Sequence, residues 1–450
     1  MEGTSEALAA RMTGPVMVPG DAGYDAEVAA ANLAVRHTPD VVAGVTSAAD
    51  AAAALRFAAE MGYRVTVQDT GHGAHAPIAS GLLISPRRLN GVEIDAAAGT
   101  ATVGGGATWA PVVAAAAAHG LCPVTGSSTA VGVAGYLLGG GLGPLARSHG
   151  FSSDYLLGAT VVTGAGETLA AGPDSHPDLF WALRGGREGL GVVTELRLRL
   201  VRLATLYGGS LFFEEAETER VLRTWLAWTA TADPRVTTSV AFYHFPDLDV
   251  LPPPLRGRRL FSLRFAYPGP AEDGARLAAP LRAAGEIYLD RLGELPVAEI
   301  ARIHSDPTAP APSRVGGRLL THAGDGLAGA LLAHLGPRTG SPFTQVELRH
   351  IAGATGPDVA GGSAVGGRGA AFVLGYVGTD PATFARVLPD AAGRLVADLG
   401  AWIAPVTNVN FLGGAHTAAE LAGAWPADTF ARLAAVRRRY DPRGVLAFGT

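Results

Sequence analysis

Apolar and polar residues along the chain follow two periods, one typical of helices and one of strands, and together they predict an α+β protein. Residues 46–68 begin with helical spacing and end in a short apolar run. Ser47 is the expected N-cap of this helix, Gly62 its end, and the strand covers residues 63–68. Shorter elements are predicted downstream: strands at 82–85, 92–95 and 101–103, and a helix at 111–118.

Residues 156–201 predict a hairpin, a short helix and a long strand. Two apolar runs, 156–163 and 168–171, flank the turn Gly-Ala-Gly-Glu and predict the hairpin. Pro177 suits the first position of the short helix. Apolar and charged residues then alternate over 190–201, which is the period of a strand with one buried face.

The segment 131–145, Val-Gly-Val-Ala-Gly-Tyr-Leu-Leu-Gly-Gly-Gly-Leu-Gly-Pro-Leu, is rich in glycine. Because glycine loses more backbone freedom in a helix than other residues do, we expect no stable helix here. Glycine also lets the backbone approach a bound molecule closely, as a flat cofactor requires.

The pattern changes near residue 205, where longer strands alternate with helical stretches. This pattern predicts a second domain built on an antiparallel sheet, with strands at 236–245, 259–267, 344–351 and 371–377 and helices near 215–230, 271–285 and 381–399. The loops 246–256 and 352–369 are long enough to border a substrate pocket.

Composition narrows the classes of partner. A net charge of -5 without a large basic cluster gives no electrostatic reason to expect nucleic acid or an anionic membrane, so a small molecule is the expected partner. The single cysteine, Cys122, excludes an intramolecular disulfide and a cysteine-rich metal site, and no metal is expected. Without a signal-like start or a membrane-spanning run, the protein is expected in the cytoplasm, as a monomer or homodimer.

Two glycine motifs suggest cofactor chemistry. Gly71-His72-Gly73 directly follows a predicted strand, and its glycines would expose backbone amides to an anion while the imidazole projects into a cavity. The alternative is a histidine in an ordinary turn. Gly141 to Ala146 match the dinucleotide pattern G-x-G-x-x-A, but no strand precedes them and Asp154 comes too early, so we exclude a Rossmann site.

Several segments taken together give a more specific signal: PGDAGYD, TPDVVAGVTSAADAAAALRFAAEMGYRVTVQDTGHG, GLLISPRRLNGVEIDAAAGTATVGGGATWAPV, VGVAGYLLGGGLGPLARSHG, HPDLFWALRGGREGLGVVTE and YDPRGVLAFG. In this order the chain resembles the berberine bridge enzyme-like flavoproteins of the vanillyl-alcohol oxidase and p-cresol methylhydroxylase superfamily. The match is dense over residues 15–205 and thin over the last forty. The resemblance implies an FAD-binding domain from 1–205 and 401–450, with a substrate domain at 206–400 whose antiparallel sheet is covered by helices.

The resemblance also implies how FAD is held. In the family a histidine equivalent to His72 is joined to the 8α-methyl carbon of the flavin, so we expect covalent FAD at His72. Many relatives add a bond from a cysteine in G-x-C-P-x-V-G, whereas this chain has Ser128 at that place, so no second bond is expected. Cys122 is interpreted as a small buried apolar residue.

Further cofactor contacts are carried over from the family. The expected pyrophosphate loop is Thr70, Gly71, His72, Gly73, Ala74 and His75. The residues expected along the cofactor are Ser127, Ser128, Val131, Gly132, Gly135, Gly140, Leu142, Asn410 and Phe411, with Gly191 and Val193 at the adenine. Val131 resembles the family's oxygen gate, and its alternative role is plain packing.

The catalytic base is not given by the resemblance. Relatives often carry Y-x-N-Y near the C-terminus, but here the segment 408–411 reads Asn-Val-Asn-Phe and both hydroxyls are missing. Strand alternation places Glu347 and Arg349 on one face, which makes Glu347 beside Arg349 the first candidate. The alternative is a solvated ion pair, and Tyr376 and Tyr243 are reserve candidates.

These observations predict an FAD-dependent oxidase acting on a secondary metabolite. It would take a hydride from a C–H next to a hydroxyl or amine and pass the electrons to dioxygen, giving hydrogen peroxide. Three alternatives stay open: a dehydrogenase with another electron acceptor, a flavin-holding cyclase or scaffold without net redox change, and a binding protein without flavin.

Overall fold

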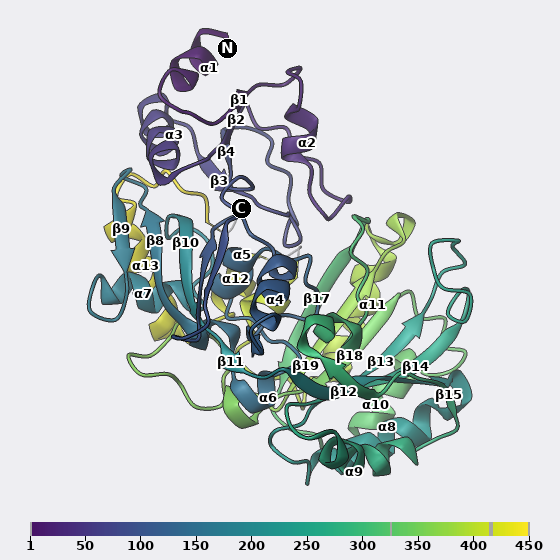
Figure 1. Cartoon of the computed structure of the whole chain (residues 1–450). Coiled ribbons are helices and arrows are strands. Elements are labelled where there is room, and N and C mark those ends of the chain that lie inside the picture. Colours follow the sequence, from purple (N-terminus) through teal and green to yellow (C-terminus); the bar gives the residue numbers. More distant parts are fainter. Residues whose placement is uncertain (1, 325, 414–416, 449–450) are drawn as a thin grey trace.

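The chain folds into four sheets, as seen in a computed structural model that describes residues 2–324, 326–413 and 417–448. The first sheet has the order β1-β2-β4-β3 and lies at the top of Figure 1. Its strands β2 and β3 run parallel to β4, and β1 runs antiparallel to β2. The elements of this part are α1 (Glu2–Ala9), β1 (Val16–Met17), α2 (Tyr24–Val28), β2 (Val41–Gly44), α3 (Ala48–Met61), β3 (Val65–Val67) and β4 (Leu82–Ser85).

The first predicted helix and strand are confirmed. The side chain of Ser47 accepts a hydrogen bond from the amide of Asp50 at the start of α3. Gly62 ends the helix with φ 70°, a left-handed conformation that glycine adopts without strain. β3 then leads into the loop that carries His72.

The second sheet is antiparallel, with the order β5-β6-β10-β8-β9. β8 and β9 form the predicted hairpin, Pro177 stands at the start of α7, and β10 alternates buried and exposed residues as predicted. The strands are β5 (Val92–Asp95), β6 (Thr100–Gly104), β8 (Leu156–Val162), β9 (Thr168–Ala171) and β10 (Val192–Arg199). A small pair is formed by β7 (Leu121–Cys122) and β11 (Val201–Arg202). The helices around them are α4 (Trp109–Ala117), α5 (Val133–Leu138), α6 (Ala146–His149) and α7 (Pro177–Leu183).

The expectation that 131–145 contains no stable helix is wrong, because α5 forms within it. Val133 and Leu137 of this helix are almost fully buried in a core that includes Trp109. Tertiary packing therefore outweighs the low helix propensity of glycine. The glycines after α5 do remain outside the helix, and Gly140 and Gly141 have φ values of 97° and 80°.

The third large unit is a sheet of eight strands in antiparallel pairs, with β16 paired to β12 beside the path β15-β12-β14-β13-β18-β19-β17. Its strands are β12 (Thr205–Glu214), β13 (Thr237–His244), β14 (Arg259–Tyr267), β15 (Ile287–Asp290), β16 (Gly293–Pro296), β17 (Arg314–Leu320), β18 (Gln345–His350) and β19 (Phe372–Gly378). The helices of this unit are α8 (Thr218–Thr229), α9 (Ala271–Arg282), α10 (Leu327–Leu335) and α11 (Val387–Asp398). Short 3₁₀ helices lie between these elements: η1 (Ser152–Tyr155), η2 (Glu215–Glu217), η3 (Val297–Ile303), η4 (Gly353–Thr355), η5 (Pro381–Thr383) and η6 (Val409–Phe411).

The two faces of the eight-stranded sheet differ in chemistry. One face packs Phe261, Phe265 and Leu374 against the helices that cover it at the lower right of Figure 1. The opposite face carries polar residues, including Arg264 and Glu347. The predicted antiparallel sheet covered by helices is therefore confirmed.

The end of the chain returns to the N-terminal part. α12 (Ala418–Ala422) and α13 (Ala427–Tyr440) contribute Leu421, Leu433 and Val436 to the core around the second sheet. Leu446 pairs with Val65 of β3 in a parallel bridge. Among the helices of the described ranges, none is long and apolar enough to cross a membrane.

Candidate functional site

His72 lies in a tight loop directly after β3. Its Nδ1 is 3.0 Å from the hydroxyl oxygen of Thr70, and burial lowers the pKa of His72, so the ring is neutral near neutral pH. Gly71 has φ 68°, and a Cβ at this position would lie 2.6 Å from the Cβ of Ala30. The loop is also held from outside, since the side-chain amide of Asn32 donates to the carbonyl oxygen of Ala74. His75 Nδ1 lies 3.1 Å from the carbonyl oxygen of Gly73.

Asp69 connects this loop to the start of α5. A Cβ on Gly132 would lie 2.2 Å from Asp69 Oδ2, so glycine is required for the approach. Within the described part of the chain, this buried oxygen has no hydrogen-bond partner. Burial raises the pKa of Asp69 to about 6. The contact brings the predicted residues around His72 next to those around Gly132.

The loop before α5 and the helix itself carry further buried polar atoms without a partner among the described residues: Thr125 Oγ1, Ser128 Oγ and the Tyr136 hydroxyl. The ring of Tyr136 lies between two glycines, because a Cβ on Gly126 or Gly141 would come within 2.9 or 2.4 Å of it. A Cβ on Gly135 would meet open space. Buried polar groups normally find partners, so this concentration fits a large ligand with many hydrogen-bonding atoms.

The predicted residues near the C-terminus reach the same place. The side-chain amide of Asn410 donates to the carbonyl oxygen of Tyr136 over 3.2 Å. Phe411 lies under the guanidinium group of Arg349, whose carbon is 5.9 Å from the ring centre. Arg349 also donates to the carbonyl oxygen of Leu142 over 3.2 Å. The polar face of the eight-stranded sheet therefore meets the glycine-rich segment here.

The remaining predicted contacts lie on the second sheet, in its core or in the loops that flank α5. Val131 is half-buried against the core that includes Trp109. Gly140 lies beside Phe151, and Ser127 precedes Ser128 in the loop between β7 and α5. Gly191 comes directly before β10, where Val193 pairs with Val161. These positions stay predicted cofactor contacts.

Glu347 is the centre of a buried polar cluster, which we call the Glu347 cluster: Ser239, Arg264, His304, Glu347 and Arg349. Oε1 of Glu347 accepts hydrogen bonds from Ser239 Oγ and Arg264 Nη1, each over 2.7 Å. Oε2 accepts from Arg349 Nε over 2.9 Å. Glu347 is only 5% exposed, so the alternative of a solvated ion pair is wrong.

The arginines determine the charge of Glu347. Burial alone would raise the pKa of this carboxyl, but Arg349 and Arg264 outweigh burial and hold it well below its usual range. Glu347 is therefore an anion at every pH near neutrality. Its negative charge in turn stabilises the positive charges of both arginines.

The two reserve tyrosines lie on opposite faces of the sheet. The Tyr243 hydroxyl accepts a hydrogen bond from Arg264 Nη2, and burial raises the pKa of Tyr243 to about 12. Tyr376 packs against Phe343, with ring centres 5.4 Å apart, on the face covered by helices. The structure thus brings Tyr243 to the Glu347 cluster and leaves Tyr376 outside it.

Sequence reasoning missed Arg264, Ser239 and His304. Arg264 is 83 positions from Glu347 and Ser239 is 108 positions away, so no local motif connects them. Strand alternation in β13 and β14 was a usable signal, because a charged residue in an otherwise apolar strand needs a buried partner. His304 follows a short 3₁₀ helix and carries no comparable signal.

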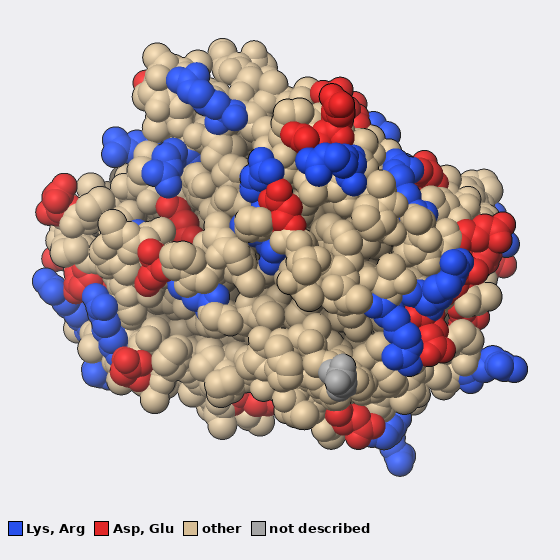
Figure 2. All heavy atoms as spheres, turned by 90° about the horizontal axis from the view of Figure 1, so that it is seen from below, with Lys and Arg blue, Asp and Glu red and all other residues tan. Residues whose placement is uncertain are grey.

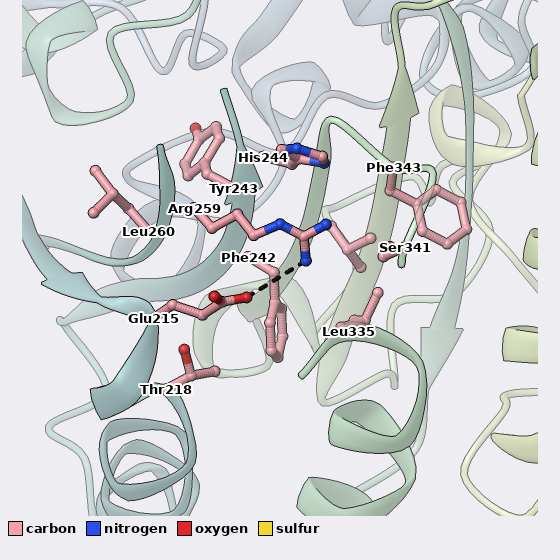
Figure 3. A pocket seen from close by; sticks show the side chains of 11 residues that line it. Glu215, Thr218, Phe242, Tyr243, His244, Arg259, Leu260, Leu335, Ser341 and Phe343 are labelled. Atoms are coloured by element: carbon pink, nitrogen blue, oxygen red, sulfur yellow. Dashed lines mark hydrogen bonds and ion pairs between the residues drawn. The ribbon is translucent and has the colours of Figure 1, made fainter. Parts of the chain in front are cut away.

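Two hollows lie near the eight-stranded sheet. One borders the Glu347 cluster and is lined by Ser239, Arg264, His304 and Arg349 together with Gly143 and Pro144. The other opens at the end of β13 (Figure 3). Arg259 crosses it toward Glu215, and the two side chains lie 3.5 Å apart. Because that ion pair neutralises both charges, we assign this second hollow no part in the chemistry.

Neither the single cysteine nor a metal site adds to this arrangement within the described residues. Cys122 is fully buried among apolar side chains, and burial raises the pKa of its thiol to about 12. In the described ranges, no group of three or more His, Cys, Asp or Glu side chains is arranged to hold a metal ion.

Comparison with known proteins names the ligand that this arrangement fits. Residues 39–172 match the family described as FAD binding domain. The (R)-6-hydroxynicotine oxidase of Paenarthrobacter nicotinovorans is 37% identical over 192 residues, and the chain spans 42% of that relative's length. An uncharacterised FAD-linked oxidoreductase of Bacillus subtilis, YgaK, is 25% identical over 68% of this chain and 67% of its own.

Solved structures extend the likeness to the whole fold. The 6-hydroxy-D-nicotine oxidase of Arthrobacter nicotinovorans covers 96% of both chains with a TM-score of 0.83 at 24% identity. The berberine bridge enzyme-like protein 1 of Physcomitrella patens covers 99% of this chain and 98% of its own, with a TM-score of 0.85 at 18% identity. The chain therefore contains an FAD binding domain and has the fold of the berberine bridge enzyme-like flavoproteins, as the resemblance implied.

Proposed function

We propose that this protein is an FAD-dependent oxidase that removes a hydride from a C–H next to a hydroxyl or amine of a small secondary metabolite. The observation that carries the proposal is the contact of Arg349 with Leu142, which sets the Glu347 cluster against the glycine-rich segment predicted to line the cofactor. Relatives that are named oxidases support it, among them the hydroxynicotine oxidase and a glucooligosaccharide oxidase of Sarocladium strictum.

The residues that would hold FAD fit such a cofactor. Thr70 to His75 would contact the pyrophosphate, and the unpartnered atoms of Asp69, Ser128 and Tyr136 would gain partners. The neutral ring of His72 would form the single covalent bond, since a neutral nitrogen has the lone pair that bond formation needs. One structural neighbour, at a TM-score of 0.83, is described as carrying a 6-S-cysteinyl, 8α-N1-histidyl FAD. When bound, FAD accepts the hydride and passes electrons to dioxygen, which gives hydrogen peroxide.

The Glu347 cluster would bind and orient the substrate. Its donors, Arg264, Arg349 and Ser239, come from adjacent strands of a rigid sheet, and such sites hold groups more precisely than loops do. Burial excludes water and strengthens each polar contact. Val131 would leave room for dioxygen beside the cofactor.

A small neutral or weakly charged partner also suits the surface. Figure 2 shows basic and acidic side chains interspersed on the face seen from below, rather than a large field of one sign. Such a surface gives no electrostatic attraction for nucleic acid.

The first test is the absorption spectrum of purified protein before and after acid precipitation. We expect the yellow colour to stay with the precipitate in the wild type and to enter the supernatant in His72→Ala. His75→Ala, in the same loop, is the matched control and should keep its flavin bound. Flavin released equally from all three proteins would exclude the covalent bond, and colourless protein would exclude the function.

The second test follows anaerobic bleaching of the flavin by a panel of 6-hydroxynicotine, 1-phenylethanol and cellobiose. An oxidase should be bleached by a substrate, recover its colour at once in air and release hydrogen peroxide. Slow recovery in air would indicate a dehydrogenase with another acceptor. A bound panel compound that changes without bleaching the flavin would indicate a scaffold or cyclase.

A further inference from the structure

His304 is a buried histidine beside Glu347. It follows η3, and its side chain is 5% exposed. Its Nε2 lies 3.5 Å from Glu347 Oε1, but neither ring nitrogen has a hydrogen bond among the described residues. Buried polar groups are normally paired, so an open imidazole in a candidate site indicates a missing ligand atom.

The ring of His304 borders a small hollow between the sheet and the glycine-rich segment. The hollow is lined by His304, by Ser239, Arg264 and Arg349 from the sheet, and by Gly143 and Pro144. Gly143 directly follows Leu142, the residue that Arg349 contacts. The hollow therefore lies where the glycine-rich segment meets the sheet.

Glu347 is less suited to take a proton than His304. Three donors already occupy its two oxygens, and two arginines favour its charged form. Burial lowers the pKa of His304, Glu347 raises it again, and Arg264 and Arg349 lower it. The ring is thus neutral with an open lone pair, and the adjacent carboxylate can stabilise the cation formed when a proton arrives.

We propose that His304 is the proton acceptor of the reaction and that Glu347 is the residue that positions it and stabilises its charged form. The O–H or N–H bond of the substrate breaks as its proton moves to a ring nitrogen of His304. The neighbouring C–H bond breaks as its hydrogen leaves with both electrons, which reduce FAD, and a C=O or C=N bond forms. The inference rests on the proposed oxidation. It implies that the substrates are alcohols or amines whose O–H or N–H can reach this hollow.

The first experiment measures the titration of His304 directly. Full-length protein is labelled with ¹³C at Cε1 of its 12 histidines, and the His304 signal is assigned by its loss in His304→Gln. We expect it to titrate reversibly, and its pKa to fall by about one pH unit in Glu347→Gln, a tenfold loss of proton affinity. His37, also buried but outside the Glu347 cluster, should give the same titration in both proteins. A His304 signal that does not titrate, or that ignores Glu347→Gln, overturns the proposal.

The second experiment uses anaerobic flavin bleaching by the reactive member of the panel over a range of pH. In the wild type the rate should rise as His304 loses its proton and then level off. His304→Gln should keep its flavin, lose this pH dependence and bleach about 100-fold more slowly or worse. An unchanged rate or pH profile would exclude His304 as the acceptor. If the purified protein contains no flavin, the proposed function is contradicted. The titration of His304 then still tests the role of this residue.

Discussion

Asp69, which is half-buried, and Glu347, which is buried, are two carboxyls whose pKa values move in opposite directions. Burial raises both, but Glu347 is bonded to the guanidinium groups of Arg264 and Arg349. Arg87 approaches Asp69 as well, yet its Nε donates to the backbone oxygen of Asp69 and not to the carboxylate. The position of the positive charge therefore decides in which direction each pKa moves.

Asp69 gives a prediction about pH at the scale of one residue. Burial raises its pKa from 3.8 to about 6, so the folded state binds the proton more tightly than the unfolded chain does. The stability that the protonated carboxyl retains below about pH 4 is then lost as the pH rises through 6. Asp69→Asn should stabilise flavin-free protein at pH 8 by up to about 3 kcal/mol, and hardly at all near pH 4, in chemical denaturation.

The control for this prediction is Asp174→Asn, because Asp174 is exposed in a turn. Its effect on the free energy of unfolding should be small at both pH values. An Asp69→Asn effect that is the same at pH 4 and pH 8 would contradict the assigned pKa.

At the scale of single elements, α3 shows how a local signal sets the ends of a helix. Ser47 caps its first turn and Gly62 ends it, while the buried carboxylate of Asp50 accepts hydrogen bonds from the amides of Thr13 and Gly14. Ser47→Ala should lower the free energy of unfolding by about 1 kcal/mol, because one buried amide loses its acceptor. Thermal denaturation would measure this, with Ser80→Ala in an exposed loop as the control. Equal melting temperatures for the two variants would contradict the role of the cap.

Other elements were less accessible to local reasoning. β15 and β16 have four residues each, too few to show a reliable alternation, and each exists because it pairs with β12. α5 formed against its own propensity, since the core around Trp109 buries its apolar residues. Longer strands such as β10 and β14 were predicted correctly because their apolar patterns extend over eight or nine residues.

At the scale of the whole molecule, the chain end completes the N-terminal part. Arg437 of α13 donates to the carbonyl oxygens of Gly186 and Glu188, over 2.6 and 3.2 Å. Burial lowers the pKa of Arg437 to about 10, so the side chain still carries its charge near neutral pH. These two hydrogen bonds connect residues that are 251 and 249 positions apart along the chain.

Two neighbouring arginines in α13 provide a matched test of how much this helix stabilises the N-terminal part. Arg437→Ala leaves one buried and one partly buried carbonyl oxygen without their charged donor, and it should cost about 2 kcal/mol or more in the free energy of unfolding. Arg438→Ala removes an exposed side chain and should change it by less than about 0.5 kcal/mol. Urea denaturation of both variants measures the difference. Similar values would mean that α13 contributes little to the N-terminal core.

The sequence by itself determined the features that depend on neighbours along the chain. The capped helix, the strand and the His72 loop fall within about thirty consecutive residues, because caps, turns and strand periods act over short distances. Tertiary structure alone decided the chemistry of the Glu347 cluster. Glu347, Arg264 and His304 come from separate elements, and only folding brings them close enough for charge compensation and burial to set their protonation.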